Sequence, residues 1–165
     1  MELWDLYTRD RQLTGRTHRR GDPIPEGCYH VAVHVWIVNS KGEYLISQRS
    51  AARRAFPLYW ETTGGSAIAG EDSLTAALRE AKEEVGVDLD PAQGKLIASL
   101  IREVYHDIAD VWLFRYDGEV HLENSTTAEV DQVKWMTRTE IGELARTDKW
   151  VHNLDYFFHK ELFEE

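Results

Sequence analysis

The segment 65–87, GSAIAGEDSLTAALREAKEEVGV, limits the folds open to this chain more than any other stretch. Its apolar residues recur at helical spacing, which predicts one helix with a single buried face. Asp72 or Ser73 suits the start of this helix, and Gly86 suits its end. The buried face is expected to comprise Leu74, Ala77, Leu78, Ala81 and Val85. The glutamates of the segment are expected to lie off that face.

Carboxylates crowd one turn of this helix. Glu80 and Glu84 are four residues apart, Glu83 lies beside them, and Glu71 comes just before the helix. Like charges at these spacings cost roughly a few tenths of a kcal/mol per pair. A hard divalent cation such as Mg²⁺ prefers carboxylate oxygens and would offset that cost, while Arg79 is placed to pair with Glu83. For the letters REAKEE alone, a solvated acidic face is the plainer interpretation, because Glu and Lys are common helix formers.

Strand patterns surround the helix. Residues 29–50 predict a hairpin with its turn at 39–43, and both faces of its first strand are apolar, as in an interior strand. Residues 57–63 predict a short strand that leads into Gly64 and Gly65. Further strands are expected in 95–105, 110–116 and 133–136, and helices in 139–145 and 150–163. Together these elements predict a layered α/β fold with a mixed sheet and helices on its two faces.

A chain of 165 residues is most simply a single domain, 1–165, in which 1–28 is expected to form an arm, with a short strand, followed by a loop. The net charge of −10 repels polyanions, so extended nucleic acid is not an expected partner. The longest apolar stretch is too short to span a bilayer. The single cysteine, Cys28, and the lack of a charged-then-apolar leader predict a cytoplasmic setting. A homodimer is left open.

The spacing within 65–87 is more specific than its charge. The defined positions are Gly65, Glu71, Arg79-Glu80-Ala81, Glu83-Glu84 and Gly86-Val87. At every one of them the segment resembles the Nudix box, the 23-residue signature of the Nudix hydrolases. Taking seven fixed residue types at roughly 7% usage each, chance would supply such a match in about one in a million chains of this length. The chain is therefore identified as a member of the Nudix superfamily.

This resemblance implies a Nudix-type α/β/α sandwich that uses Mg²⁺, or alternatively Mn²⁺, to hydrolyse a diphosphate linkage. The implied substrates are small molecules in which a nucleoside diphosphate is joined to another moiety. Glu80 and Glu84 would be the principal metal ligands, and Glu83 would be a further ligand or a base. Metal ions would neutralise the diphosphate oxygens and lower the pKa of a bound water, which then attacks phosphorus in line with its leaving oxygen.

Supporting roles follow from the same resemblance. Glu71 would support the site from the loop, the carbonyl of Gly65 would be a ligand, and Arg79 would orient a glutamate. Glu129 stands where Nudix chains often carry an acidic residue ahead of the final strand, which implies a distant ligand or base. A surface glutamate in an acidic loop is an equal alternative for Glu129. Weaker candidates of the same kind form a polar loop between strands, namely His106, Asp107 and Asp110.

The resemblance extends ahead of the box. LISQRSAARRAFPLYW, with the strand before it, looks like the corresponding segment of the type I isopentenyl-diphosphate isomerases, a branch of the same fold. Arg49 and Arg53 stand where that branch holds the diphosphate, so they are expected to bind substrate phosphate. His30 matches an isomerase metal histidine, although a lone histidine in an interior strand is more often a core residue. The catalytic Cys and the metal-binding His of the isomerases are absent after Trp60, which favours hydrolysis.

Substrate choice stays open at this level. Nucleotide sugars, nucleoside di- and triphosphates, dinucleotides and ADP-ribose all fit the resemblance. Five aromatic residues offer faces that can stack on a base, although each is more often a core residue: Trp60, Tyr105, Trp112, Trp150 and Tyr156. The alternatives to a hydrolase are an isomerase-like enzyme and a nucleotide-sensing module without turnover. The intact glutamates argue against the sensing module, which has no chemical need for all of them.

Overall fold

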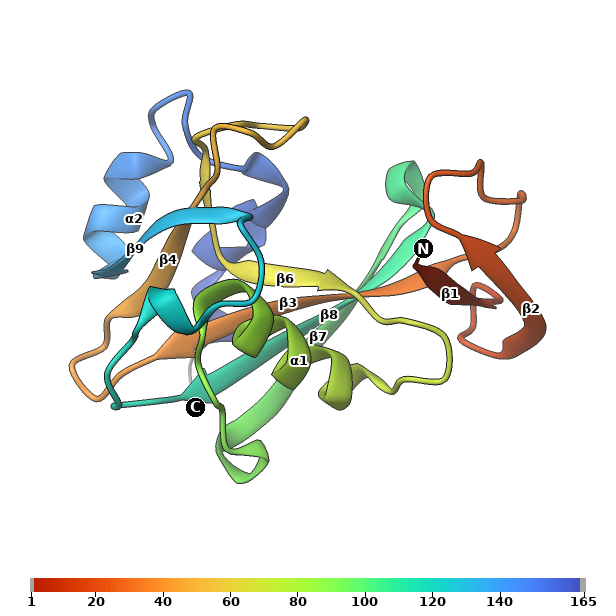
Figure 1. Cartoon of the computed structure of the whole chain (residues 1–165), viewed down its shortest axis with the longest axis horizontal. Helices are drawn as coiled ribbons and strands as arrows, with labels where there is room; N and C mark the ends of the chain where they lie inside the picture. The colour runs from red at the N-terminus through yellow and green to blue at the C-terminus, as the bar shows by residue number, and fades with distance from the viewer. Residues whose placement is uncertain (1, 164–165) are drawn as a thin grey trace.

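The computed structural model describes residues 2–163 and contains a mixed sheet with helical segments on both faces (Figure 1). Strand β3 (His30–Val38) runs through the middle of the sheet. It pairs in parallel with β8 (Asp107–Arg115), which pairs antiparallel with β7 (Gly94–Arg102). The observed α/β class and mixed sheet confirm the architecture predicted from the sequence.

The other edge of β3 is shared between two strands. Along the first half of β3 the partner is β6 (Thr63–Ser66), whereas β4 (Tyr44–Arg49) meets β3 only where Val38 faces Tyr44. Strand β4 continues the sheet by pairing with β5 (Trp60–Glu61) and with β9 (Val130–Met136). The sheet therefore divides between β4 and β6, and the polar cavities described below open where these two strands part.

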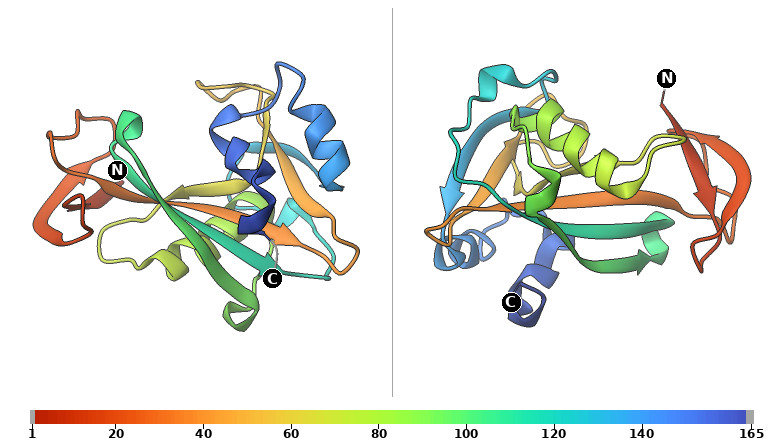
Figure 2. Two further views of the ribbon diagram at one scale, coloured as in Figure 1. Left: turned by 180° about the vertical axis from the view of Figure 1, so that it is seen from behind. Right: turned by 90° about the horizontal axis from the view of Figure 1, so that it is seen from below.

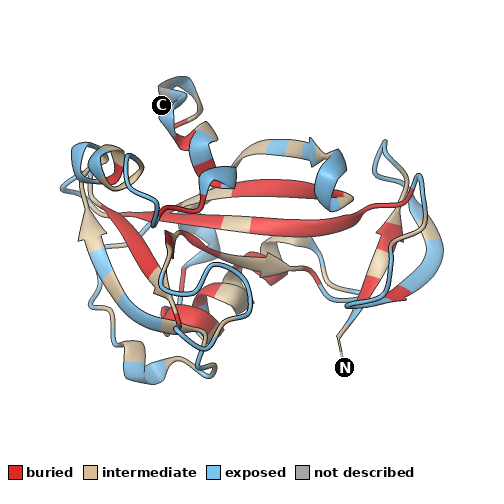
Figure 3. Ribbon diagram, turned by 90° about the horizontal axis from the view of Figure 1, so that it is seen from above, coloured by how far each residue is buried: buried red, intermediate tan, exposed pale blue. Residues whose placement is uncertain are grey.

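Two apolar cores cover the two faces of β3, as its sequence predicts. Helical segments lie on either side of the sheet in Figure 2, and most of β3 is coloured as buried in Figure 3. The odd-numbered side chains, from Val31 to Ile37, pack against helix α1 (Ser73–Val85). Trp36 and Val38 pack against the opposite layer, which contains α2 (Arg138–Leu144) and the 3₁₀ segment η4 (His152–Phe158). The remaining 3₁₀ turns are η1 (Pro91–Gln93), η2 (Glu103–Tyr105), η3 (Leu122–Asn124) and η5 (Lys160–Leu162).

The N-terminal arm is a two-stranded hairpin rather than a single strand with a loop. Strands β1 (Leu3–Tyr7) and β2 (Leu13–Arg19) form their own antiparallel sheet, at the right of Figure 1. The Trp4 ring stacks on His30 with 3.9 Å between ring centroids. The Arg11 guanidinium holds both carboxylate oxygens of buried Asp110, at 2.7 and 2.6 Å. These contacts fasten the hairpin to the end of β3 and β8.

The C-terminal segment 150–163 is not the α-helix that its sequence predicts. It forms 3₁₀ segments, and three of its buried side chains, Val151, Leu154 and Phe157, recur every third residue. That spacing keeps the three side chains on one side of a helix with three residues per turn, so the contact with the sheet favours the tighter winding. Across residues 2–163, no helix has both the length and the apolar character needed to cross a bilayer.

Candidate active site

Helix α1 is bounded by the residues that the sequence indicates. The Asp72 carboxylate accepts a hydrogen bond from the Thr75 amide at 2.8 Å. At the other end, Gly86 has a φ of 70°, a left-handed backbone conformation that residues other than glycine rarely adopt. The buried residues of α1 are Ala76, Ala77, Ala81, Glu84 and Val85, and the expected Leu74 and Leu78 are partly buried against the same core. This set contains one of the clustered glutamates.

Glu84 therefore corrects the expectation that all the glutamates lie off the buried face. It is only 4% exposed. Its Oε1 accepts hydrogen bonds from the Thr63 hydroxyl at 2.7 Å and from the Gly64 amide at 2.9 Å. Burial, followed by repulsion from Glu80 and Glu61, raises the pKa of Glu84 to about 8. Apolar periodicity missed this residue because a polar side chain became buried only where β6 supplied donors for it.

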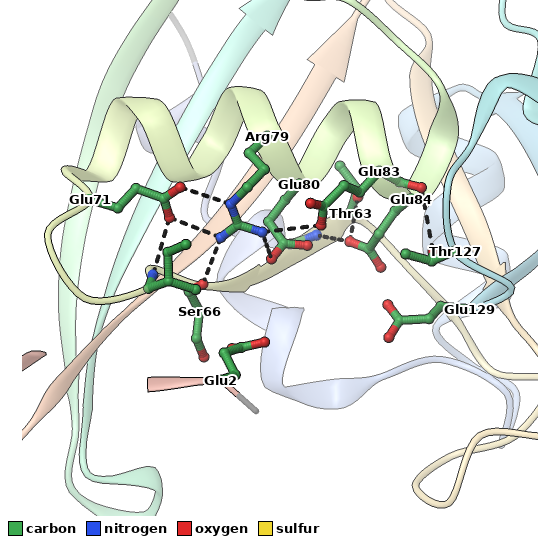
Figure 4. A network of polar contacts seen from close by, with 12 residues as sticks. Glu2, Thr63, Ser66, Glu71, Arg79, Glu80, Glu83, Glu84, Thr127 and Glu129 are labelled. Atoms are coloured by element: carbon green, nitrogen blue, oxygen red, sulfur yellow. Dashed lines mark hydrogen bonds and ion pairs between the residues drawn. The ribbon is translucent and has the colours of Figure 1, made fainter. Parts of the chain in front are cut away.

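Arg79 ties the remaining acidic residues together (Figure 4). Its Nε and Nη2 donate to the two oxygens of Glu71 at 2.8 and 2.9 Å, and Nη2 also reaches the Ser66 carbonyl at 3.1 Å. Its Nη1 lies 3.0 Å from Glu80 and 3.1 Å from Glu83, so the pair expected with Glu83 is present. Burial raises the pKa of Glu80 to about 7 even though Arg79 opposes the shift. Arg79 thus offsets part of the repulsion that the carboxylates exert on one another.

Two consecutive glycines let β6 lie close to both the helix and β3. Gly64 is opposite His34, and Gly65 is opposite Val33, in the β3–β6 pairing. A Cβ atom on Gly65 would overlap the Glu80 carboxylate, whereas a Cβ atom on Gly64 would overlap the Val33 carbonyl oxygen. The Glu80 carboxylate therefore occupies the space that a side chain at position 65 would need.

The chemistry of the donor set fits a hard divalent cation. Glu80 and Glu83 line a cavity of about 210 Å³, and Glu129 lines it from the segment ahead of β9. Carboxylate oxygens are the ligands that Mg²⁺ prefers. Within residues 2–163, no group of three acidic, histidine or cysteine side chains is already gathered as a metal site. Arg79 contacts Oε1 of Glu80 and Oε2 of Glu83, so the other oxygen of each carboxylate can bind a cation while Arg79 stays in place.

Two arginines lie beside the carboxylate cluster and line a neighbouring cavity. Arg49 donates from Nη1 to Glu61 at 2.8 Å, and Nη1 of Arg53 lies 3.3 Å from Glu129. Both arginines line a second cavity, of about 220 Å³, together with Glu84. This second cavity shares Arg53 and the 64–66 backbone with the first. The structure thus brings the predicted phosphate ligands and the predicted metal ligands to two adjoining cavities.

Known proteins with similar sequences identify the family of this chain. The family model described as the NUDIX domain matches residues 29–158. The chain belongs to the Nudix family. A Nudix hydrolase from Listeria innocua is 37% identical over 165 residues, which span 99% of this chain and 95% of that protein. The chain is accordingly a Nudix pyrophosphohydrolase.

Two further similarities bear on the fold and on the segment ahead of the Nudix box. The crystal structure of DR0079 from Deinococcus radiodurans superimposes with a TM-score of 0.77 at 21% identity, covering 96% of this chain and 98% of that one. An isopentenyl-diphosphate Delta-isomerase from Shigella flexneri is 28% identical over 81 residues, which are 48% of this chain and 44% of that protein. The first similarity supports the Nudix fold, and the second extends over only part of the chain.

Sequence reasoning missed several residues that line the 220 Å³ cavity of this Nudix chain, among them Glu61, Arg102 and Asn153. Arg102 ends β7 directly opposite Asp107 on β8. An oppositely charged pair across two strands is a recognisable signal once the register is known, but the register itself is not legible from one sequence. Glu61 is partly buried between buried Trp60 and buried Thr62, and a charged residue in a short predicted strand is the strongest local signal among the three.

Asp107 and Asp110 do not form the polar loop expected between strands. Both belong to β8, and they are 3% and 0% exposed. Arg102 donates to the two oxygens of Asp107 at 2.8 and 2.6 Å, as Arg11 does to Asp110. Paired guanidinium groups make the burial of these carboxylates tolerable. His106 alone of the three lies outside the strand, in the turn before it.

The five candidate aromatic residues are mostly structural. Trp60 and Trp150 are buried in the core, and the Tyr156 hydroxyl accepts a hydrogen bond from Trp36 Nε1 at 2.9 Å. Tyr105 is the exposed member of the five, at 48%. The Arg102 guanidinium lies 4.6 Å from the centroid of the Tyr105 ring. An exposed ring near the cavity leaves Tyr105 as the candidate surface for a substrate base.

Proposed function

We propose that this Nudix pyrophosphohydrolase cleaves the diphosphate linkage of a nucleoside-diphosphate-type compound with Mg²⁺, or alternatively Mn²⁺, in its carboxylate cluster. One observation supports the proposal most strongly. Glu84 and Glu80 are held side by side at the β6 backbone with pKa values raised to about 8 and 7. Carboxylates kept in such surroundings in the walls of two adjoining cavities are typical of a functional site, because a fold gains little by burying them.

The residues of the chain divide the work between the two cavities. Glu80 and Glu84, with Glu83 and the Gly65 carbonyl, would hold the metal, and Glu71 would keep Arg79 in place beside them. Bound divalent ions would supply charge neutralisation of the diphosphate oxygens and a water of lowered pKa. Arg49 and Arg53 would hold the diphosphate from the opposite side, because a guanidinium fork matches two phosphate oxygens.

Two carboxylates are accessible enough to take the proton of the attacking water. The side chains of Glu83 and Glu129 are 37% and 40% exposed, and both line the 210 Å³ cavity. A carboxylate that faces the cavity can exchange its proton with solvent after each turnover, whereas the buried Glu84 cannot do so easily. We assign the base to one of these two residues, and comparison of Glu83→Gln with Glu129→Gln in single-turnover kinetics identifies which.

A substrate panel tests the proposal. Phosphorylated products should be released from nucleotide diphosphate compounds in the presence of Mg²⁺, and EDTA should abolish the release. Isopentenyl diphosphate belongs to the panel as a contrasting substrate. We expect no conversion to dimethylallyl diphosphate, because Gly64, Gly65 and Ala67 occupy the region where isomerisation needs a thiol and an imidazole. Binding without turnover across the panel would instead identify a sensing module, and substantial isomerisation would overturn the hydrolase assignment.

Replacement of Arg53 by alanine separates a substrate role from a structural one. Because Arg53 pairs only with the partly exposed Glu129 in a 3.3 Å contact, its loss should hardly change the melting temperature. We expect kcat/KM to fall about 10- to 100-fold, which is roughly 1.4 to 2.7 kcal/mol of transition-state stabilisation. Arg54→Ala, at an exposed neighbouring position, is the matched control and should leave both quantities unchanged.

Arg49→Ala should behave differently from Arg53→Ala. Arg49 is the charge partner of Glu61, whose pKa burial already raises, so removing the guanidinium leaves a buried carboxylate uncompensated. Its melting temperature should therefore fall together with kcat/KM. Unchanged kcat/KM in Arg53→Ala would show that other groups hold the diphosphate.

A further inference from the structure

Three buried side-chain nitrogen atoms have no hydrogen-bond partner among residues 2–163, and all three belong to residues that line the 220 Å³ cavity. They are Nδ1 of His30, Nη1 of Arg53 and Nη1 of Arg102. His30 is only 6% exposed. Nearly all buried polar groups in folded proteins have a partner, and each exception needs an explanation. Three exceptions on residues that line one cavity indicate a ligand that would supply partners for them.

The contacts around each nitrogen explain why it lacks a hydrogen bond. Arg102 uses Nε and Nη2 on the two oxygens of Asp107, at 2.8 and 2.6 Å, which leaves Nη1 unused. Nη1 of Arg53 lies in its ion pair with Glu129 but without the alignment of a hydrogen bond. The His30 ring is held by its stack on Trp4, and its Nε2 is 4.0 Å from Asp107, too far for a hydrogen bond. The donors are therefore fixed in place before any ligand arrives.

The unused groups define the chemistry of the ligand. Both guanidinium nitrogens are donors only, and Arg49 adds a third guanidinium to the wall of the cavity. Phosphate oxygens are acceptors only, and guanidinium groups bind them through strong charge-assisted bonds. The cavity is also smaller than the roughly 300–1,000 Å³ of sites that enclose a whole drug-sized ligand. It therefore has room for one phosphorylated group but not for a nucleoside.

We propose that this cavity binds a second phosphate of the substrate, which is not hydrolysed and lies beyond the scissile diphosphate. The inference rests on the proposed function and narrows its substrate class to diphosphate compounds that carry an additional phosphate group. A single molecule can occupy both places, because the cavity shares Arg53 and the 64–66 backbone with the cavity of the carboxylate cluster. The scissile diphosphate would lie at the shared wall and the second phosphate between His30 and Arg102.

Matched substrates test the proposal through a ratio. NADPH and NADH share their diphosphate and differ by one ribose phosphate, and coenzyme A differs from dephospho-coenzyme A in the same way. We expect wild-type kcat/KM to favour the phosphorylated member of at least one pair by about tenfold or more. His30→Phe keeps the ring on Trp4 and loses its nitrogens, while R102Q/D107N keeps a neutral polar pair across β7 and β8. Both variants should reduce the ratio toward one, and Arg9→Gln, at an exposed arginine, should not.

A binding measurement without metal separates the failure of this inference from the failure of the proposed function. In EDTA, inorganic phosphate should raise the melting temperature of the wild-type protein and of Arg9→Gln, but not of R102Q/D107N or His30→Phe. Ratios near one for every pair, with phosphate stabilising all four proteins equally, would overturn the inference while leaving hydrolysis intact. Stabilisation by ribose as large as that by phosphate would also overturn it, because the site would then recognise hydroxyl groups. Absence of hydrolysis from both members of every pair, with the phosphate effect present, would reject the function and retain the anion site.

Discussion

Replacing Glu84 by glutamine is expected to lower kcat/KM by about a thousandfold or more, roughly 4 kcal/mol, while the fold is retained. The glutamine Oε1 can accept the hydrogen bonds from Thr63 and Gly64 that the carboxylate now accepts. What disappears is the negative charge at the position we assign to a metal ligand. Steady-state kinetics on the best substrate of the panel, with circular dichroism as the check on folding, measures the effect. A variant with wild-type rates would remove Glu84 from the metal site.

The same substitution has a consequence for the metal-free protein. The pKa of Glu84 is about 8 in the folded state, whereas an exposed glutamate titrates near 4.5. Between these values the unfolded chain releases the proton and the folded chain keeps it, so stability falls as pH rises through this window. Glutamine does not titrate, so Glu84→Gln should not lose stability in this way as pH rises. In EDTA, its melting temperature should exceed that of the wild type by more at pH 8.5 than at pH 5.5. Glu26→Gln, at an exposed position, should follow the wild type at both pH values.

Alanine at the two consecutive glycines should give opposite defects. At Gly65 the new methyl group would displace the Glu80 carboxylate, which is the end of a flexible side chain, so activity should fall about 100-fold with a small change in melting temperature. At Gly64 the methyl group would meet the Val33 carbonyl in the β3–β6 pairing, where backbone must move. We expect a cost of about 1–3 kcal/mol there, or a melting temperature lower by roughly 2–12 °C.

Parallel thermal unfolding and kinetics on the two alanine variants distinguish these outcomes. Each variant is the control for the other, since the same atom is added one residue apart. Full activity in Gly65→Ala would mean that the position of the Glu80 carboxylate does not matter for turnover. An unchanged melting temperature in Gly64→Ala would mean that β6 can shift away from β3 without cost.

Local patterns were sufficient to predict much of this fold. The ends of α1 follow from Asp72 and Gly86, and the two buried faces of β3 follow from its unbroken apolar run. The burial of Glu84 did not follow, because a polar residue is buried only when another segment supplies hydrogen-bond donors, and that segment is twenty residues away in β6. Strand register and packing decide such long-range partners, and neither can be predicted from a single sequence.

The residues of the candidate site likewise divide into those that local sequence patterns predict and those that depend on long-range contacts. The carboxylate cluster and the arginines ahead of it could be predicted because they lie close together in the sequence or match a family pattern. Arg102 and its pairing with Asp107 could not, since that pairing depends on the register between β7 and β8. The prediction of an α-helix at 150–163 was wrong for a different reason. The apolar residues of this segment suit a helix of either winding, and only contact with Trp36 and its neighbours selects the 3₁₀ form.

The hairpin of β1 and β2 lies outside the span of the family model but inside the folding unit. The family match begins at residue 29, yet Arg11 neutralises Asp110 inside the sheet, and Tyr7 exchanges backbone hydrogen bonds with Tyr29. Trp4 also covers one face of His30, which lines the second cavity. A chain shortened to the matched span would carry an unneutralised carboxylate in its interior and an open wall beside its substrate. In this protein, a segment outside the family model is part of the enclosure in which catalysis would take place.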